Sequence, residues 1–214
     1  MVITSQQLKL ICPTIPAYEV EKIASSLTEI CPQYGIDTPD IFHEFIANLA
    51  HESQEFNRRE ENLKYSSAKR LMTIWPSRFA SEADAQKYVY NPEKLANKVY
   101  GGRADLGNVQ QGDGWQFRGG GYIQITGRRN YTLFTAYYNR RFGTSFTIEQ
   151  IAHLIRETID MAVHSACWIF AISMKLIDEA QNDLVKVIRK RINGGLFGLD
   201  EVNQYYERAK KAIV

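Results

Sequence analysis

Apolar residues recur at steps of three and four along most of this chain, and this spacing limits its possible folds more than any other feature. In "PAYEVEKIASSLTEICPQYGI", Val20, Ile23, Leu27 and Ile30 fall on one face of a helix. Segments of the same kind occupy most of the remaining sequence. We therefore predict a mainly α-helical fold.

Two more segments carry signals for the start of a helix. The segment "TPDIFHEFIANLAHESQEF" offers Thr38 or Asp40 as the residue that begins a helix. The segment "NPEKLANKVYGG" has Asn91 as a cap, Pro92 in the first turn and glycine at its end. The apolar stripe of the first segment is Phe42, Phe45, Leu49 and Phe56.

The second half of the chain contains two further predicted helices. Residues 154–177 are strongly apolar, which indicates a central buried helix or two helices in succession. "NDLVKVIRKRINGG" is helical in pattern and stops at Gly194 and Gly195.

Residues 100–131 hold most of the glycine-rich sequence and form the least helical part of the chain. Within them "GYIQIT" alternates as a short strand would. We expect one domain over residues 1–214, with a smaller helical lobe over about 71–115 inserted in the main helical body. The irregular segment would line a groove between the lobe and the body.

Charge and cysteine content exclude several classes of function. The net charge is only +2, from 26 basic and 24 acidic residues, so nucleic-acid binding has no electrostatic support. The chain has three cysteines, an odd number, and they are widely spaced: Cys12, Cys31 and Cys167. This pattern argues against a set of disulfides and against a zinc site, and it favours buried free thiols. The sequence shows no signal peptide and no run of roughly 18 apolar residues, so we expect no membrane insertion.

Two glutamates near the end of a predicted helix have contrasting surroundings. Glu52 shares the apolar stripe with Leu49 and Phe56, and burial would raise the pKa of its carboxyl, as a general acid requires. Glu61 lies in the polar, partly cationic run "NRREENLK", where a carboxylate should stay ionised, as a general base must. Such a pair is typical of a glycosidase. The neighbouring Glu60 is interpreted as a solvated surface charge.

The spacing of the two glutamates sets a condition on the backbone. Nine residues of continuous helix would separate them by about 13 Å and put them on opposite faces. The helix must therefore end near Phe56 or Asn57, and the chain must turn back.

Five motifs occur in order along the chain. They are "AHES" at 50–53, "EENLKYS" at 60–66, "NPEKLANKVYGGR" at 91–103, "GDGWQFRGGGYIQITGRRNY" at 112–131 and "RINGG" at 191–195. Together they resemble the lysozyme-like catalytic domain of glycoside hydrolase family 19, which includes chitinases, and more closely the phage and prophage endolysins built on that domain. The resemblance runs from about residue 30 to the C-terminus and implies a lysozyme-like, two-lobed helical fold.

The resemblance also implies roles for individual residues. Glu52 corresponds to the acid that protonates the glycosidic oxygen, Glu61 to the base that activates water, and Thr126 to a hydroxyl residue that helps to hold that water. Inverting enzymes of this kind need the carboxyls roughly 6.5–9.5 Å apart. The substrate-binding positions are Gln124, Asn130, Asn193 and Tyr65.

Each substrate-binding position has a structural alternative. Gln124 could satisfy backbone groups beside a strand, Asn193 could cap its helix, and Tyr65 could pack in a core. His51 is interpreted as a structural hydrogen bonder beside Glu52 instead of a catalyst, and Trp115 as either a sugar-contacting ring or a loop anchor.

The chain departs from the family pattern in two places. The glycine-rich turn reads "RGGGYIQ", where relatives often have a basic residue between the glycines. Glu201 and Val202 stand where an arginine thought to support the base is usual. Arg191, Arg208 and Arg103 are the candidates to replace it.

The sequence therefore predicts an endolysin-type glycosidase that cleaves β-1,4 bonds of the peptidoglycan glycan strand, with no metal and no cofactor. We expect a monomer that accumulates in a host cytoplasm and reaches the cell wall through a separate holin-like pore. A chitinase and a non-catalytic glycan-binding domain are the alternatives. Nucleotide binding is disfavoured because "RGGGYIQITG" lacks the G-K-[ST] ending of a phosphate loop.

Overall fold

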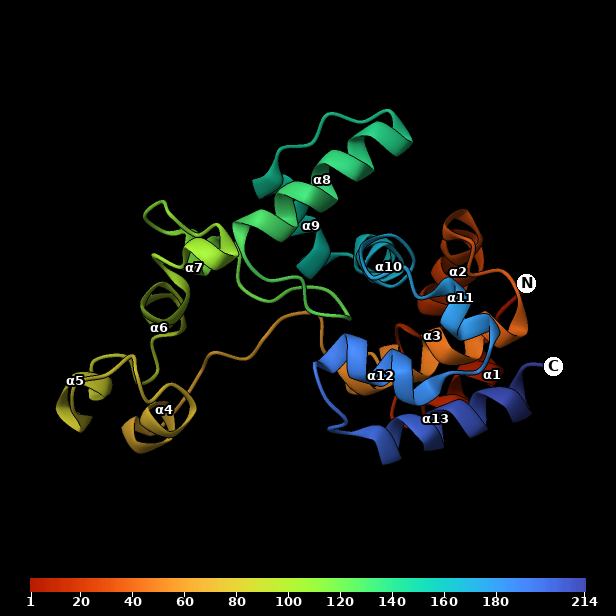
Figure 1. Ribbon diagram of the computed structural model, residues 1–214, viewed down its shortest axis with the longest axis horizontal. Coiled ribbons are helices and arrows are strands. Elements are labelled where there is room, and N and C mark those ends of the chain that lie inside the picture. Colours follow the sequence, from red (N-terminus) through yellow and green to blue (C-terminus); the bar gives the residue numbers. More distant parts are fainter. The chain divides into compact units, whose positions relative to one another are not determined.

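The computed structural model describes all 214 residues, which form helices joined by turns and loops (Figure 1). Contacts divide the chain into two compact units. The first comprises Met1–Arg59, Gly121–Gln124 and Leu154–Val214, and the second comprises Glu60–Gly120 and Ile125–His153. The prediction of a mainly α-helical fold is confirmed.

The first unit combines helices from both ends of the chain. The predicted stripe of Val20, Ile23, Leu27 and Ile30 is buried on one of them, as expected. The elements are α1 (Ser5–Ile11), α2 (Val20–Ile30), a 3-10 turn (Cys31–Tyr34), α3 (Pro39–Glu52), α10 (Ile159–Cys167), a π-helical turn (Trp168–Ser173), α11 (Ile177–Gln181), α12 (Val185–Asn193) and α13 (Leu199–Ala212).

Helix α3 is the core helix of the first unit. Thr38 caps its start, and α11 and α13 both pack against it. Every residue from 41 to 50 is buried, so the helix is covered on all sides. The sequence pattern predicted a single apolar stripe here and missed the burial of polar residues on the other faces.

Glu44 is one of these buried polar residues of α3. Its side chain is fully buried, and neither carboxyl oxygen has a hydrogen-bond partner. Burial, followed by the nearby Asp183 carboxylate, raises the pKa of Glu44 to about 8, although Lys210 opposes the change. Folded Glu44 therefore keeps its proton at neutral pH, whereas the unfolded chain releases it.

Because Glu44 is buried with its proton, we predict that the free energy of unfolding depends on pH, and that Glu44→Gln removes this dependence. Because the pKa is higher in the folded chain, the free energy of unfolding falls as pH rises from about 4.5 to about 8 and stays reduced above that range. The fall approaches about 1.4 kcal/mol for each pH unit in the interval. In urea denaturation between pH 4.5 and 9, Glu44→Gln should gain stability relative to wild type with rising pH and level off above pH 8. Parallel pH profiles for the two proteins would contradict the assignment.

The chain leaves α3 through an unusual left-handed turn. Gln54, Glu55 and Phe56 have φ angles of 52°, 57° and 67°, in a region that side chains other than glycine rarely adopt. Buried Glu55 holds this turn, because its carboxylate accepts hydrogen bonds from Thr14 N–H, Thr14 Oγ1 and Tyr205 Oη at 2.5, 2.6 and 2.9 Å. The predicted end of the helix near Phe56 or Asn57 is therefore wrong, because α3 already ends at Glu52.

The "GYIQIT" segment is also not the strand that its alternation predicted. Gly120 and Ile125 exchange backbone hydrogen bonds of 3.0 and 2.7 Å, and the chain between them turns tightly. Gly121 opens the turn with a φ of 82°, and Tyr122 and Ile123 are both buried instead of alternating. Only isolated β-bridges form in this region.

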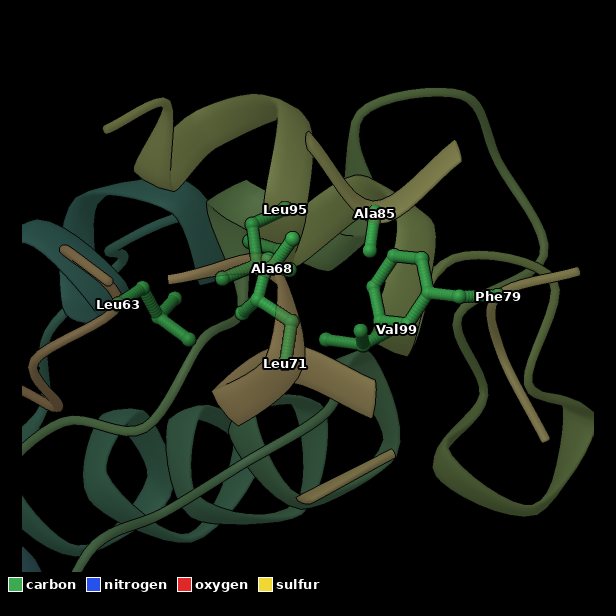
Figure 2. Close-up of a cluster of buried hydrophobic side chains, with 8 residues drawn as sticks. Leu63, Ala68, Leu71, Phe79, Ala85, Leu95 and Val99 are labelled. Carbon is green, nitrogen blue, oxygen red and sulfur yellow. The ribbon is translucent and has the colours of Figure 1, made fainter. Parts of the chain in front are cut away.

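The second unit has its own small apolar core, shown in Figure 2. Asn91 caps one of its helices through a hydrogen bond from Lys94 N–H, as predicted. The predicted lobe of 71–115 lies within this unit, which extends beyond it along the chain. The elements are α4 (Ala68–Ile74), α5 (Glu82–Gln86), α6 (Pro92–Tyr100), a 3-10 turn (Ala104–Leu106), α7 (Asp113–Gln116), α8 (Arg128–Phe142) and the first part of α9 (Ile148–Glu157).

The core in Figure 2 draws on residues far apart in sequence. Leu63 precedes the helices, Leu71 comes from α4, and Leu95 and Val99 come from α6. Tyr65 and Trp115 pack against its edge. This core fixes the segment that follows Glu61 and the end of α6.

The three cysteines are buried free thiols, as predicted. Cys31 and Cys167 are distant in sequence, yet their sulfur atoms lie 3.8 Å apart. None of the helices is both long and apolar enough to cross a membrane.

Candidate active site

Glu52, the predicted acid, is the last residue of α3 in the first unit. Its Oε1 lies 2.5 Å from Arg189 Nη1, and its side chain is 26% exposed. A carboxylate at a helix C-terminus faces the negative end of the helix dipole, and the guanidinium offsets that repulsion. The sequence predicted apolar surroundings for Glu52, but the structure supplies a cation.

Arg189 lies on α12 and is only 1% exposed. A buried guanidinium needs acceptors, and Arg189 has two, because its Nε also donates to the Phe197 carbonyl oxygen at 2.7 Å. Asn193 Nδ2 donates to the same carbonyl at 3.2 Å. One guanidinium thus joins the Glu52 carboxyl to the loop that follows α12.

His51 packs against this loop beside Glu52. A Cβ atom at Gly198 would lie 2.3 Å from His51 Cε1, so only glycine permits the contact. Burial, and then Arg189, lower the pKa of His51 below its usual value, so its ring is neutral at neutral pH. The His51 ring therefore packs against this loop, and its role as a structural hydrogen bonder remains a prediction.

Glu61, the predicted base, belongs to the second unit and is held at both carboxyl oxygens. Gly119 N–H donates to Oε1 at 2.5 Å, and Tyr100 Oη donates to Oε2 at 2.8 Å. Burial, and then Glu61 itself, raise the pKa of Tyr100, so its hydroxyl remains a hydrogen-bond donor. The backbone of Glu61 also pairs with Gly119, since its N–H donates to the Gly119 carbonyl at 3.1 Å.

Glu60 was predicted to be a solvated surface charge, but the structure pairs it with an arginine. Its carboxylate pairs with Arg118 at 2.5 Å and is 39% exposed. Arg118 in turn stacks on the Trp115 ring, with 3.5 Å between the guanidinium carbon and the ring centroid. Trp115 also donates its backbone N–H to Asn97 Oδ1 at 2.9 Å, so it anchors a loop.

None of the three candidate arginines contacts Glu61. Arg191 pairs with Glu179, and Arg103 pairs with Asp105. Arg208 donates to the Ile11 carbonyl at 3.3 Å. Arg59, expected to give Glu61 a cationic setting, instead forms a bidentate ion pair with Glu19. The base is therefore supported by a hydroxyl and a backbone N–H, and none of the three candidates takes the place of the family's arginine.

The predicted polar binding residues all make local backbone contacts. Gln124 Nε2 donates to the Gly121 carbonyl at 3.0 Å, within the tight turn. Asn130 Nδ2 donates to the Thr126 carbonyl at 2.9 Å, at the start of α8. These bonds order the glycine-rich segment that carries Thr126, and the assignment of Thr126, Gln124, Asn130 and Asn193 to substrate remains a prediction.

Tyr65 is half-buried and makes an edge-to-face contact with Trp75, with 5.5 Å between ring centroids. Its carbonyl oxygen accepts the Tyr90 N–H at 2.8 Å. Most of the contacts of Tyr65 are therefore those of a residue packed in a core, which was the structural alternative. Its role in sugar binding remains a prediction.

Sequence reasoning missed two residues that hold the glutamates. Arg189 lies one helical turn before Asn193 in "RKRINGG", and Tyr100 directly precedes the glycines of "VYGGR". Tyr100 belongs to a motif that was recognised, and Arg189 lies two residues before another. Their closeness in sequence to these motifs was the available signal. No group of three or more His, Cys, Asp or Glu side chains is arranged to hold a metal ion.

The sequence and the structure were compared with those of known proteins. No family model matches the sequence. A glycosyl hydrolase family 19 domain-containing protein from Haemophilus influenzae is 36% identical over 162 residues, which cover 76% of this chain and 74% of that protein.

Two solved structures share the fold. The crystal structure of chitinase C from Streptomyces griseus aligns over 99% of this chain and 75% of its own, with a TM-score of 0.58 and 15% identity. A glutamate-to-glutamine mutant of chitinase C aligns over the same shares, with a TM-score of 0.57 and 13% identity. The sequence relationship decides the family, and these structures confirm the helical fold. The chain belongs to glycosyl hydrolase family 19 and is a glycosidase.

Proposed function

We propose that this glycosidase is of the endolysin type and hydrolyses β-1,4 bonds of peptidoglycan by an inverting reaction with one acid and one base. The observation that carries the proposal is that the structure holds both glutamates of the recognised motifs through defined partners. Glu52 is tied to a buried cation, whereas Glu61 is tied to a neutral hydroxyl and a backbone N–H. Because a guanidinium by itself favours the charged form of a carboxyl, the role of acid is assigned to Glu52 from its place in the motif "AHES", and that of base to Glu61 from its place in "EENLKYS".

In the proposed reaction, Glu52 donates its proton to the glycosidic oxygen as the bond from that oxygen to the anomeric carbon breaks. Glu61 takes a proton from a water molecule whose oxygen attacks the same carbon from the opposite face. Arg189 then stabilises the carboxylate that Glu52 has become. Tyr100 and Gly119 keep the Glu61 carboxylate in one orientation, and Thr126 helps to hold the water.

The test combines cell lysis with product analysis. The protein should clear chloroform-permeabilised Gram-negative cells and release soluble glycan from purified peptidoglycan. Mass spectrometry of the new reducing ends then identifies the cleaved linkage as that of N-acetylmuramic acid or of N-acetylglucosamine. Cleavage of chitin oligomers without cleavage of peptidoglycan would replace the endolysin proposal with a chitinase. Glycan binding without any cleavage would indicate a non-catalytic domain.

The proposal also includes the route to the wall. Cells that make the protein without a separate membrane pore should remain turbid, and chloroform should then cause rapid clearing. Clearing without permeabilisation would contradict accumulation in the cytoplasm.

A further inference from the structure

Phe197 is a large aromatic residue with almost no protein packed on it. Its side chain is 80% exposed in the loop between α12 and α13, and the neighbouring Leu196 is 43% exposed. An aromatic ring left in water forgoes the free energy that burial of its apolar surface would provide. That free energy is available to a ligand that covers the ring.

The backbone beneath this ring is firmly held. The Phe197 carbonyl oxygen accepts hydrogen bonds from both Arg189 and Asn193. The next residue, Gly198, lies against the His51 ring. The loop therefore presents an unpacked side chain on an anchored main chain, which limits the ordering cost that a ligand would have to meet.

Arg189, which holds the Phe197 backbone, also connects this residue to the acid Glu52. Arg189 contacts the Glu52 carboxyl through Nη1 and the Phe197 carbonyl through Nε. The Phe197 carbonyl and the Glu52 carboxyl therefore share one guanidinium group, so the loop that carries the exposed ring is joined to the acid through a single side chain. A sugar ring next to a glycosidic oxygen at Glu52 would therefore be within one side chain's reach of this loop.

We propose that Phe197 is a substrate-binding residue that stacks on a pyranose ring of an N-acetylated amino-sugar strand beside the scissile bond. Pyranose rings offer a face of C–H groups, and the flat apolar face of an aromatic side chain complements it. This inference rests on the proposed function. It adds an aromatic contact in the first unit to the polar substrate-binding residues predicted from sequence.

The experiment measures binding separately from catalysis. In a Glu61→Gln background, which leaves the Glu52–Arg189–Phe197 contacts intact, calorimetry measures the dissociation constant for soluble peptidoglycan strands stripped of peptide. Phe197→Ala should weaken binding about tenfold, because covering one face of an aromatic side chain is worth roughly that factor. Phe197→Trp should bind at least as well as the parent. In the active enzyme, Phe197→Ala should raise KM more than it lowers kcat.

Tyr18 provides the matched control, because it is an 88% exposed aromatic residue without a contact to the acid. Tyr18→Ala should leave the dissociation constant unchanged. Equal binding by the parent and Phe197→Ala would overturn the inference while leaving the proposed function intact. Failure of the parent to bind any glycan strand would overturn both.

Discussion

Glu52→Gln is expected to slow hydrolysis of natural glycan by about 10²–10⁴-fold, because the amide has no proton to give to the leaving oxygen. The loss should be much smaller on an aryl glycoside with a good leaving group, since that group departs without protonation. Steady-state rates on peptidoglycan and on a 4-methylumbelliferyl oligosaccharide measure the difference.

The contact between Glu52 and Arg189 adds a second expectation for this variant. Glutamine can still accept a hydrogen bond from the buried guanidinium but carries no charge, so stability should fall by about 1–3 kcal/mol without loss of the fold. Circular dichroism and urea denaturation check this. Equal losses of activity on both substrates in a folded variant would contradict the role of Glu52 as the acid.

Glu61→Gln should cause a loss of similar size, about 10²–10⁴-fold, for a different reason. The amide cannot take a proton from water, so a better leaving group should not restore the rate. Tyr100→Phe removes one of the two hydrogen bonds that orient this carboxyl and should lower kcat by a smaller factor with little change in KM.

Glu60→Gln is the matched control for Glu61→Gln. Glu60 is the adjacent residue, and it is also held by a short contact, which it makes with Arg118. The activity of this variant should stay near that of wild type. A larger loss in Glu60→Gln than in Glu61→Gln would exchange the roles of these neighbours and contradict the assignment of the base.

The parts of the fold that depend on local side chains were predictable. Thr38 and Asn91 cap helices through their own side chains, and the α2 stripe is buried because its spacing matches one helix face. The resemblance of five motifs, spread over residues 50–195, also identified the family correctly. For both caps the deciding contact lies within a few residues in the sequence.

The features that were missed depend on distant contacts. The left-handed turn at 54–56 contains no glycine and is held by Thr14 and Tyr205, so no local signal marks it. Arg189 reaches Glu52 across 137 positions of sequence, and Tyr100 reaches Glu61 across 39. Periodicity places such residues on a helix but does not identify the partner of each side chain.

The stereochemistry of the first product tests the central claim most directly. One attack by water at the anomeric carbon, driven by an acid at position 52 and a base at position 61, inverts that carbon. Proton NMR during the first minutes of hydrolysis of a β-1,4-linked strand should therefore show the new reducing end as the α-anomer, before mutarotation. Initial release of the β-anomer would indicate a double displacement and would contradict the account.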